Sequence, residues 1–292
     1  MKRKDVLWTI VAAVLASAML WASPLSGPSE FATIDVPGSA STRAMGIDPG
    51  GDVVGDYIDN IAGHTHGFLL SGGNFFPIDF PGAIATGAKG IGPGGDIVGS
   101  YTNSPGGNAN IHGFLLSQGT FTEVQYPGKL GTIAQRIGPD GTIYGCNHDK
   151  DLGISMHGFV LSRGVFSQVE MPMSMNNGAT PAGDAIVGLY TDSGGRTHGY
   201  LIVNGDFEPF DVPGSLATNG WDISPAGLIV GQYRDTAGSL HGFLRSGDGY
   251  TTVDPPGSIS AQAFGINAGG DIVGTYVDSG GKRHGFMRWR PK

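Results

Sequence analysis

The feature that most constrains this chain is a repeat of 41–46 residues that occurs six times. A His-Gly-aromatic step marks each copy, at His66-Gly67-Phe68, His112-Gly113-Phe114, His157-Gly158-Phe159, His198-Gly199-Tyr200, His241-Gly242-Phe243 and His284-Gly285-Phe286. A glycine that usually follows Val keeps step with it, at Gly55, Gly99, Gly145, Gly188, Gly231 and Gly274. A proline, first at Pro37, is the third marker that recurs in each copy. Three markers that recur in register predict six copies of one structural unit.

Each copy contains four short segments rich in β-branched and aromatic residues, which predict four β-strands. Residues 31–37, 42–47, 96–101 and 112–116 are examples of the four kinds. Gly- and Pro-containing turns connect them, as at residues 48–51. Beyond the N-terminal segment no stretch of ten residues shows helical periodicity, so we expect an all-β meander.

A single four-stranded sheet cannot bury both of its faces, so the copies must pack on one another. The first copy opens with a strand that has no earlier partner, and the last copy ends after three strands. A closed ring lets the first strand complete the last sheet and removes both exposed edges. We therefore predict one six-bladed β-propeller of four-stranded antiparallel blades over residues 31–292, with repeats starting near residues 31, 75, 121, 166, 207 and 250.

The N-terminal segment has the layout of a secretory signal peptide. A basic start at residues 1–4 precedes an apolar run at residues 6–20 and then small residues. We predict a signal peptide at residues 1–22, a short linker at residues 23–30, and export to the periplasm or the exterior. Retention of the segment as an anchor is the alternative, and no later apolar run could cross a membrane.

The formal charge of −8 argues against nucleic acid as a partner, because phosphates require Lys and Arg. The chain has one cysteine, Cys146, which cannot form an internal disulfide. We expect Cys146 to act as a small hydrophobic residue, the fold to depend on its core, and the protein to be a monomer.

The Gly-Ile-x-x-x-Gly-x-Val-Val-Gly stretches, each followed by His-Gly-Phe-Leu, resemble the HAF-type extracellular repeat of bacteria. The resemblance covers roughly residues 31–290, although the middle position of the usual His-Ala-Phe core is Gly in every copy. It implies export and a propeller-like β fold, and it implies no assigned activity and no catalytic residues.

The six repeat histidines would lie apart around a ring, whereas metal ligands must meet at one ion. We expect them to be structural and predict no metal and no cofactor. The aspartates of the Asp-x-Pro segments (Asp35, Asp79, Asp211 and Asp254, with Gln125 and Glu170 in the other copies) are expected to accept hydrogen bonds from the turn that follows.

The Tyr-x-Asp pairs are the candidate ligand-binding residues, because a tyrosine can stack on a sugar while a carboxylate binds hydroxyls. They are Tyr57 and Asp59, Tyr101 and Asn103, Tyr190 and Asp192, Tyr233 and Asp235, and Tyr276 and Asp278. The same aspartates could instead cap their turns. The longest of these loops belong to the first three copies, which makes that part of the rim the expected place for a ligand.

No nucleophile elbow, phosphate loop or distinct carboxylate pair is present, so the sequence predicts no catalytic residues. Three functions stay open. The first is a non-enzymatic binding propeller for a polysaccharide or a cell-envelope protein. The second is a hydrolase or lyase with its site at the mouth of the central channel. The third is a purely structural extracellular module.

Overall fold

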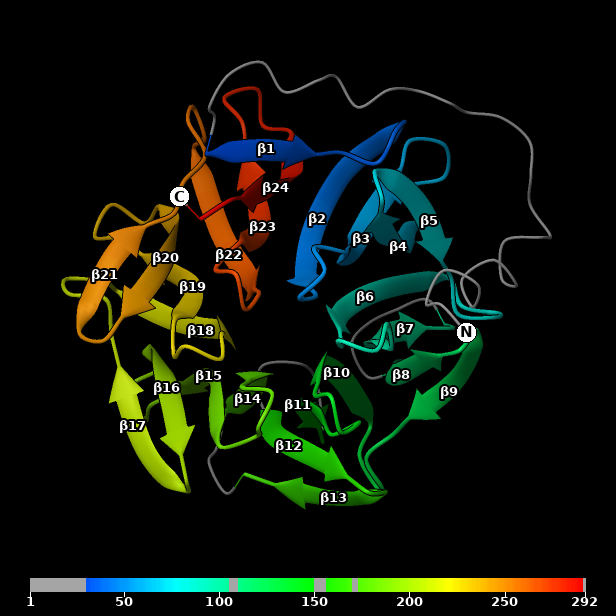
Figure 1. The fold of residues 1–292 in the computed structure, drawn as a ribbon, viewed down its shortest axis with the longest axis horizontal. Helices are drawn as coiled ribbons and strands as arrows, with labels where there is room; N and C mark the ends of the chain where they lie inside the picture. The colour runs from blue at the N-terminus through cyan, green and yellow to red at the C-terminus, as the bar shows by residue number, and fades with distance from the viewer. Residues whose placement is uncertain (1–29, 105–109, 150–155, 170–172, 291–292) are drawn as a thin grey trace.

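The computed structural model describes residues 30–104, 110–149, 156–169 and 173–290. These residues form six four-stranded antiparallel sheets arranged around a common centre, which confirms the predicted six-bladed propeller (Figure 1). The predicted signal peptide and all but the last residue of the predicted linker lie outside the described residues. Within the described residues no helix has the length and apolar character needed to cross a bilayer.

Each blade runs from an inner strand beside the central axis to an outer strand at the rim (Figure 1). Blades 1 to 3 comprise β2 (Ser39–Ile47), β3 (Val53–Asp59), β4 (Thr65–Ser71) and β5 (Asn74–Ile78); β6 (Ala85–Ile91), β7 (Ile97–Thr102), β8 (Ile111–Ser117) and β9 (Thr120–Val124); and β10 (Gly131–Ile137), β11 (Ile143–His148), β12 (Met156–Ser162) and β13 (Val165–Gln168). Blades 4 to 6 comprise β14 (Ser174–Ala179), β15 (Ala185–Thr191), β16 (Thr197–Val203) and β17 (Asp206–Phe210); β18 (Ala217–Ile223), β19 (Ile229–Arg234), β20 (Leu240–Ser246) and β21 (Gly249–Thr252); and β22 (Ser260–Ile266), β23 (Ile272–Val277), β24 (Arg283–Arg288) and β1 (Phe31–Ile34).

The N-terminal strand closes the ring. Strand β1 pairs antiparallel with β24, with Phe31 opposite Arg288 and Ile34 opposite Gly285. The Trp289 amide donates to the Glu30 carbonyl at 3.0 Å, and the Phe31 ring meets the Phe286 ring edge to face. The predicted edge pairing of the first and last segments is therefore confirmed.

The Val-Gly glycine allows the blade to pack without a gap. A Cβ on Gly55 would lie 1.9 Å from the Arg43 carbonyl oxygen and 2.8 Å from the Phe68 ring. The same close approach recurs in the other blades at Gly99, Gly145, Gly188, Gly231 and Gly274. The ring of the His-Gly-aromatic step thus occupies the space above a glycine, and the two sequence markers are two halves of one contact.

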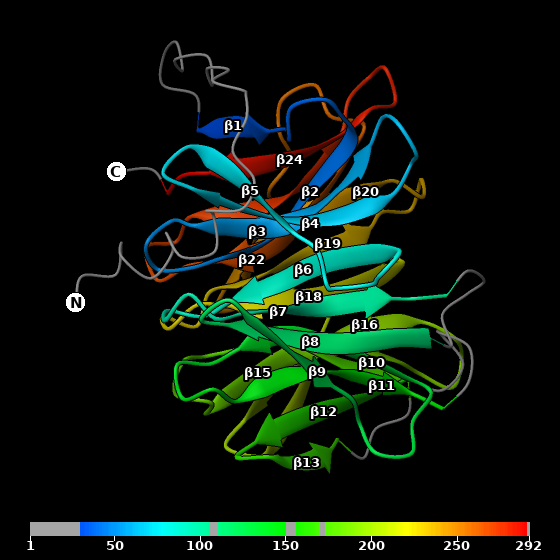
Figure 2. The same cartoon turned by 90° about the vertical axis from the view of Figure 1, so that its right-hand side faces the viewer.

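Neighbouring sheets stack face to face around the ring, and the core lies between them (Figure 2). Clusters of six or seven buried residues fill the spaces between blades 6 and 1, 1 and 2, 2 and 3, 4 and 5, and 5 and 6. Between blades 3 and 4 the described cluster is smaller and contains sulfur, with Cys146, Met156 and Leu189 at its centre.

The antiparallel order of the strands divides the connections between two faces. The loops between the second and third strands of a blade and the Pro-containing links between blades lie on one side, which we call the loop face. The hairpins that leave the inner and third strands lie on the other side, which we call the turn face. The Tyr-x-Asp loops and the inter-blade loops therefore share one mouth of the propeller.

Removing β1 should open the ring. A chain that starts at Asp35 loses the strand that covers β24, including the buried Ile34 and the Phe31 contact with Phe286. We expect its free energy of unfolding, measured by urea denaturation, to fall by at least about 3 kcal/mol relative to a chain that starts at Pro28. Equal unfolding midpoints for the two chains would show that closure by β1 is dispensable.

Candidate functional site

Among the residues that the structure describes, a histidine lies between two carboxylates in four of the blades. In blade 1, His66 Nδ1 is 2.9 Å from Asp79 Oδ1, and His66 Nε2 is 3.3 Å from Asp59 Oδ2. The imidazole stacks on the Tyr57 ring with a centroid distance of 5.2 Å. The same arrangement joins Tyr190, Asp192, His198 and Asp211; Tyr233, Asp235, His241 and Asp254; and Tyr276, Asp278, His284 and Asp35. We call this set the His-Asp network, and it links a strand to two loops on the loop face.

The aspartates of the Tyr-x-Asp pairs also organise their own turns. Asp59 Oδ1 accepts hydrogen bonds from the backbone N–H groups of Ala62 and Ile61. Asp192, Asp235 and Asp278 accept similar bonds from the backbone of their turns. These backbone hydrogen bonds, followed by that from the histidine, hold the pKa of all four carboxyls below its usual value.

The tyrosines serve first as packing groups. Tyr101 is 5% exposed and lies between Phe80, at a centroid distance of 3.6 Å, and His112, at 5.2 Å. Both faces of the Tyr101 ring are therefore covered, and its hydroxyl donates to Glu123. Each of the other four candidate tyrosines has one ring face on its histidine.

The structure places the ten candidate residues as separate sets, one pair to a blade. They lie on the loop face and do not converge on one point, because each tyrosine is opposite the histidine of its own blade in the strand register. Asn103, the partner of Tyr101 in the pattern, is exposed at the end of β7. Their ligand-binding role stays a prediction.

The expected role of the Asp-x-Pro aspartates is wrong. Their carboxylates accept hydrogen bonds from the histidines and not from the following turn, because the antiparallel register brings the histidine opposite them. A threonine from the next inner strand binds the turn instead, as where Thr42 Oγ1 accepts from the Val36 N–H. Thr86, Thr132 and Thr218 do the same. Gln125 donates to the Lys129 carbonyl, and Glu170 lies outside the described residues.

A hollow of about 220 Å³ opens on the loop face beside blades 4 and 5. Its lining consists of Thr197, Ala217, Asn219, Gln232, Tyr233, Arg234 and Leu240, and we call it the blade 4–5 hollow. The half-buried Asn219 amide makes no hydrogen bond to any described residue, and Arg234 uses one nitrogen to donate to the Gly238 carbonyl. Of these residues, the sequence singled out Tyr233 alone. Asn219 and Arg234 stand at positions that vary from blade to blade, so the repeat pattern gave no signal for them.

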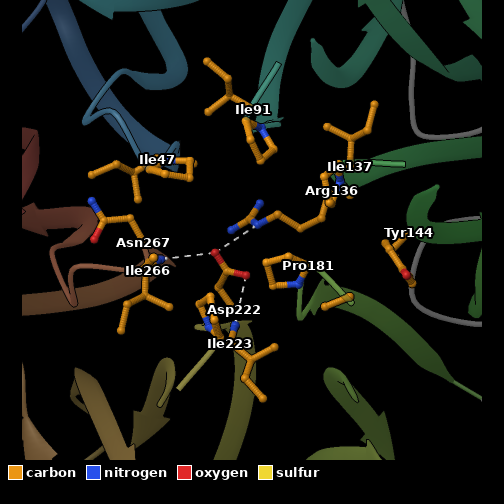
Figure 3. A pocket seen from close by; sticks show the side chains of 18 residues that line it. Ile47, Ile91, Arg136, Ile137, Tyr144, Pro181, Asp222, Ile223, Ile266 and Asn267 are labelled. Atoms are coloured by element: carbon orange, nitrogen blue, oxygen red, sulfur yellow. Dashed lines mark hydrogen bonds and ion pairs between the residues drawn. The ribbon is translucent and has the colours of Figure 1, made fainter. Parts of the chain in front are cut away.

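A second hollow, of about 130 Å³, lies at the mouth of the central channel on the turn face (Figure 3). The prolines of the inner hairpins and the isoleucines that precede them form its apolar wall, with Ile47, Ile91 and Ile137 as examples. Arg136 and Asp222 extend into it from blades 3 and 5, and their side chains face each other in Figure 3. Arg136 and Asp222 stand where the other four blades have Gly46, Gly90, Gly178 and Gly265.

Arg136 joins the blades across the axis. Its Nη1 donates to the carbonyls of Lys89 and Gln135, and its Nη2 donates to those of Met45 and Phe264. Its Nε lies 3.2 Å from Asp222 Oδ2. One guanidinium therefore contacts groups from five blades: its two terminal nitrogens donate hydrogen bonds, and its Nε contributes an ion pair without a hydrogen bond.

Asp222 is held equally firmly. Its carboxylate accepts hydrogen bonds from the backbone N–H groups of Ile223 and Ile266 as well as facing Arg136 (Figure 3). Burial raises the pKa of the Asp222 carboxyl in spite of these contacts. The pair is asymmetric in the way that a catalytic site would be, but its polar atoms are already occupied by the protein itself.

No family model matches this chain. No curated protein matches it either. Several solved structures share its fold. A putative TolB from Agrobacterium tumefaciens is 16% identical, with a TM-score of 0.54 over 86% of this chain and 91% of that one. A six-bladed fungal lectin from Aleuria aurantia is 14% identical, with a TM-score of 0.52 over 90% and 96% of the two chains. A gluconolactonase from Xanthomonas campestris is 13% identical, with a TM-score of 0.51 over 86% and 89%. At these identities the likeness establishes the propeller fold.

The His-Asp network should make stability depend on pH. Burial lowers the pKa of His241, but hydrogen bonds to Asp254 and Asp235 outweigh burial and raise it. The protonated imidazole therefore stabilises the fold below about pH 6.5, and this contribution is lost as the pH rises through the raised folded value. We expect Asp254→Asn to lower the NMR titration midpoint of His241. We also expect it to lower the midpoint of urea unfolding, and to lower it most below about pH 6.5, where the imidazole is protonated.

Asp206→Asn is the control, because Asp206 is exposed and lies outside the network. It should leave the His241 titration unchanged. A His241 midpoint that does not move in Asp254→Asn would show that the hydrogen bond between them contributes nothing to the protonated form.

Because Arg136 and Asp222 contact each other, we expect mutations of the two residues to have non-additive effects on the free energy of unfolding. Either Arg136→Gly or Asp222→Gly leaves an uncompensated buried charge, which costs about 3–5 kcal/mol of unfolding free energy. The double variant has glycine at the axis in all six blades. We expect its unfolding free energy to be at least as high as that of the less stable single variant. Urea denaturation of the four proteins measures the coupling, and additive losses would show that the two charges do not interact.

Proposed function

We propose that this chain is an exported, non-enzymatic binding propeller whose loop face recognises a carbohydrate at the blade 4–5 hollow. The proposal rests on the chemistry of that hollow. Asn219, Arg234 and Thr197 line the hollow with amide, guanidinium and hydroxyl groups. Hydrogen-bonding side chains of these kinds match a sugar, which presents several hydroxyls at its edge.

Two further observations support this function. The Aleuria aurantia lectin, a propeller of the same blade number, is described as recognising fucose, so a carbohydrate is a ligand that such a ring can bind. The signal-like segment at residues 1–22 and the resemblance to HAF-type extracellular repeats support export. A cell-envelope protein is the other partner that the loop face could take, and the binding experiment distinguishes the two.

A hydrolase or lyase site at the channel mouth is the second candidate, because Arg136 and Asp222 break the symmetry of the ring there. The carbonyls around Arg136 and the amides on Asp222 weigh against it, since both groups are used to join blades. A structural module without a ligand would leave the groups of the blade 4–5 hollow without a role.

The proposal predicts that the secreted protein is retained in affinity electrophoresis on at least one gel of a panel of polysaccharides. Asn219→Ala combined with Arg234→Ala should weaken that retention by about tenfold or more, because hydrogen bonds to neutral and charged groups are both lost. Arg283→Ala, which removes an exposed arginine from the loop face of blade 6, is the charge-matched control and should bind normally. Binding to envelope proteins with no retention on any polysaccharide would refute the carbohydrate proposal.

A further inference from the structure

Four soft metal-binding side chains gather between blades 3 and 4. Cys146 and His148 are two residues apart on β11 and therefore lie on the same face of the sheet. Met156 on β12 is directly opposite His148 in the strand register. Met175, on the inner strand of blade 4, packs against the buried cluster that contains Cys146 and Met156. We call these four residues the sulfur–imidazole cluster.

Other blade pairs carry different chemistry at the equivalent positions. Between blades 1 and 2, Asp56 receives hydrogen bonds from Arg43 and Lys89. Between blades 5 and 6, Gln232 and Gln262 are hydrogen-bonded to each other. The junction between blades 3 and 4 thus differs from these two junctions, because it contains two thioethers, a thiol and an imidazole.

The geometry brings the thiol and the imidazole together. Cys146 Sγ is 3.4 Å from His148 Nε2, and both residues are fully buried. A neutral imidazole carries a lone pair on one ring nitrogen, and that nitrogen can bind a metal ion. His148 Nδ1 is buried and has no hydrogen-bond partner among the described residues, which is costly for a structural histidine.

The donor types select the kind of ion. Thiolate and thioether sulfur are soft ligands that prefer Cu(I), and imidazole also binds copper. None of the four side chains offers the oxygen that Ca²⁺ or Mg²⁺ requires. Forming a Cu–S bond releases the thiol proton of Cys146 to solvent, and the oxidation state of the copper does not change.

We propose that Cys146, His148, Met156 and Met175 form a binding site for one Cu(I) ion. The prediction of no metal site rested on the repeat histidines, which are spread around the ring. The sulfur–imidazole cluster is instead built from residues that are not repeated in the other blades. Its one histidine, His148, is not one of the six repeat histidines. The site is independent of the carbohydrate site, because it uses no residue of the blade 4–5 hollow.

The test is an anaerobic titration of the intact secreted protein with Cu(I) in competition with the chromophoric chelator bicinchoninate. We expect one Cu(I) per chain to be withdrawn from the chelator. Cys146→Ser and the double variant Met156→Leu, Met175→Leu should each weaken binding by about tenfold or more, because each removes soft ligands. The leucine variant keeps the volume and apolar character of the cluster, so the fold is retained even if Cys146→Ser disturbs it.

Met287→Leu is the matched control, because Met287 is a partly buried methionine of blade 6 that packs in a different cluster. It should bind Cu(I) like the wild type. Failure of the wild type to withdraw Cu(I), unchanged affinity in both cluster variants, or displacement of Cu(I) by equimolar Zn(II) would each overturn the proposal.

Discussion

The antiparallel pairing of β1 with β24 is the interaction on which the rest of the molecule depends. A blade buries its faces only against neighbouring blades, so the ring is complete only when the last sheet meets the first. Ile34 and Val36, at and just after the closing strand, belong to the same buried cluster as Phe68 of blade 1 and Val273 of blade 6. Closure therefore supplies hydrogen bonds to one edge and apolar contacts to the space between the first and last blades.

The centre of the ring raises a second physical problem, which Arg136 solves. The inner strands come so close together that a Cβ on Gly90 would lie 2.6 Å from the Gln135 carbonyl oxygen. Such crowding brings carbonyl oxygens of several blades toward one axis, where their partial charges repel one another. The Arg136 guanidinium donates hydrogen bonds to four of these carbonyls, and Asp222 balances its charge.

The sequence predicted the blades and their closure because both follow from periodic patterns. It failed on partners that only strand pairing and the circular arrangement bring together. The aspartate of the Asp-x-Pro segment looked like the cap of the next turn, but Asp79 binds His66 across the sheet and Thr86 binds the turn. Tyr101 fitted the pattern of a sugar platform, yet Phe80 covers its second face. Arg136 and Asp222 gave no local signal, since only the circular arrangement brings blades 3 and 5 together at the axis.

Repetition itself separates structural from functional residues in this protein. A residue present in every blade is copied around a ring, so its copies hold similar surroundings and cannot meet at one ligand. Accordingly, the repeated histidine and aspartates hydrogen-bond within their own blade, and the repeated tyrosine stacks on that histidine. Asn219 and Arg234 in blade 5, and Cys146 and His148 in blade 3, stand at positions that vary from blade to blade, and they place unlike polar groups in one hollow or one buried cluster. The binding chemistry of the ring is therefore expected at its variable positions, because different donors can converge there.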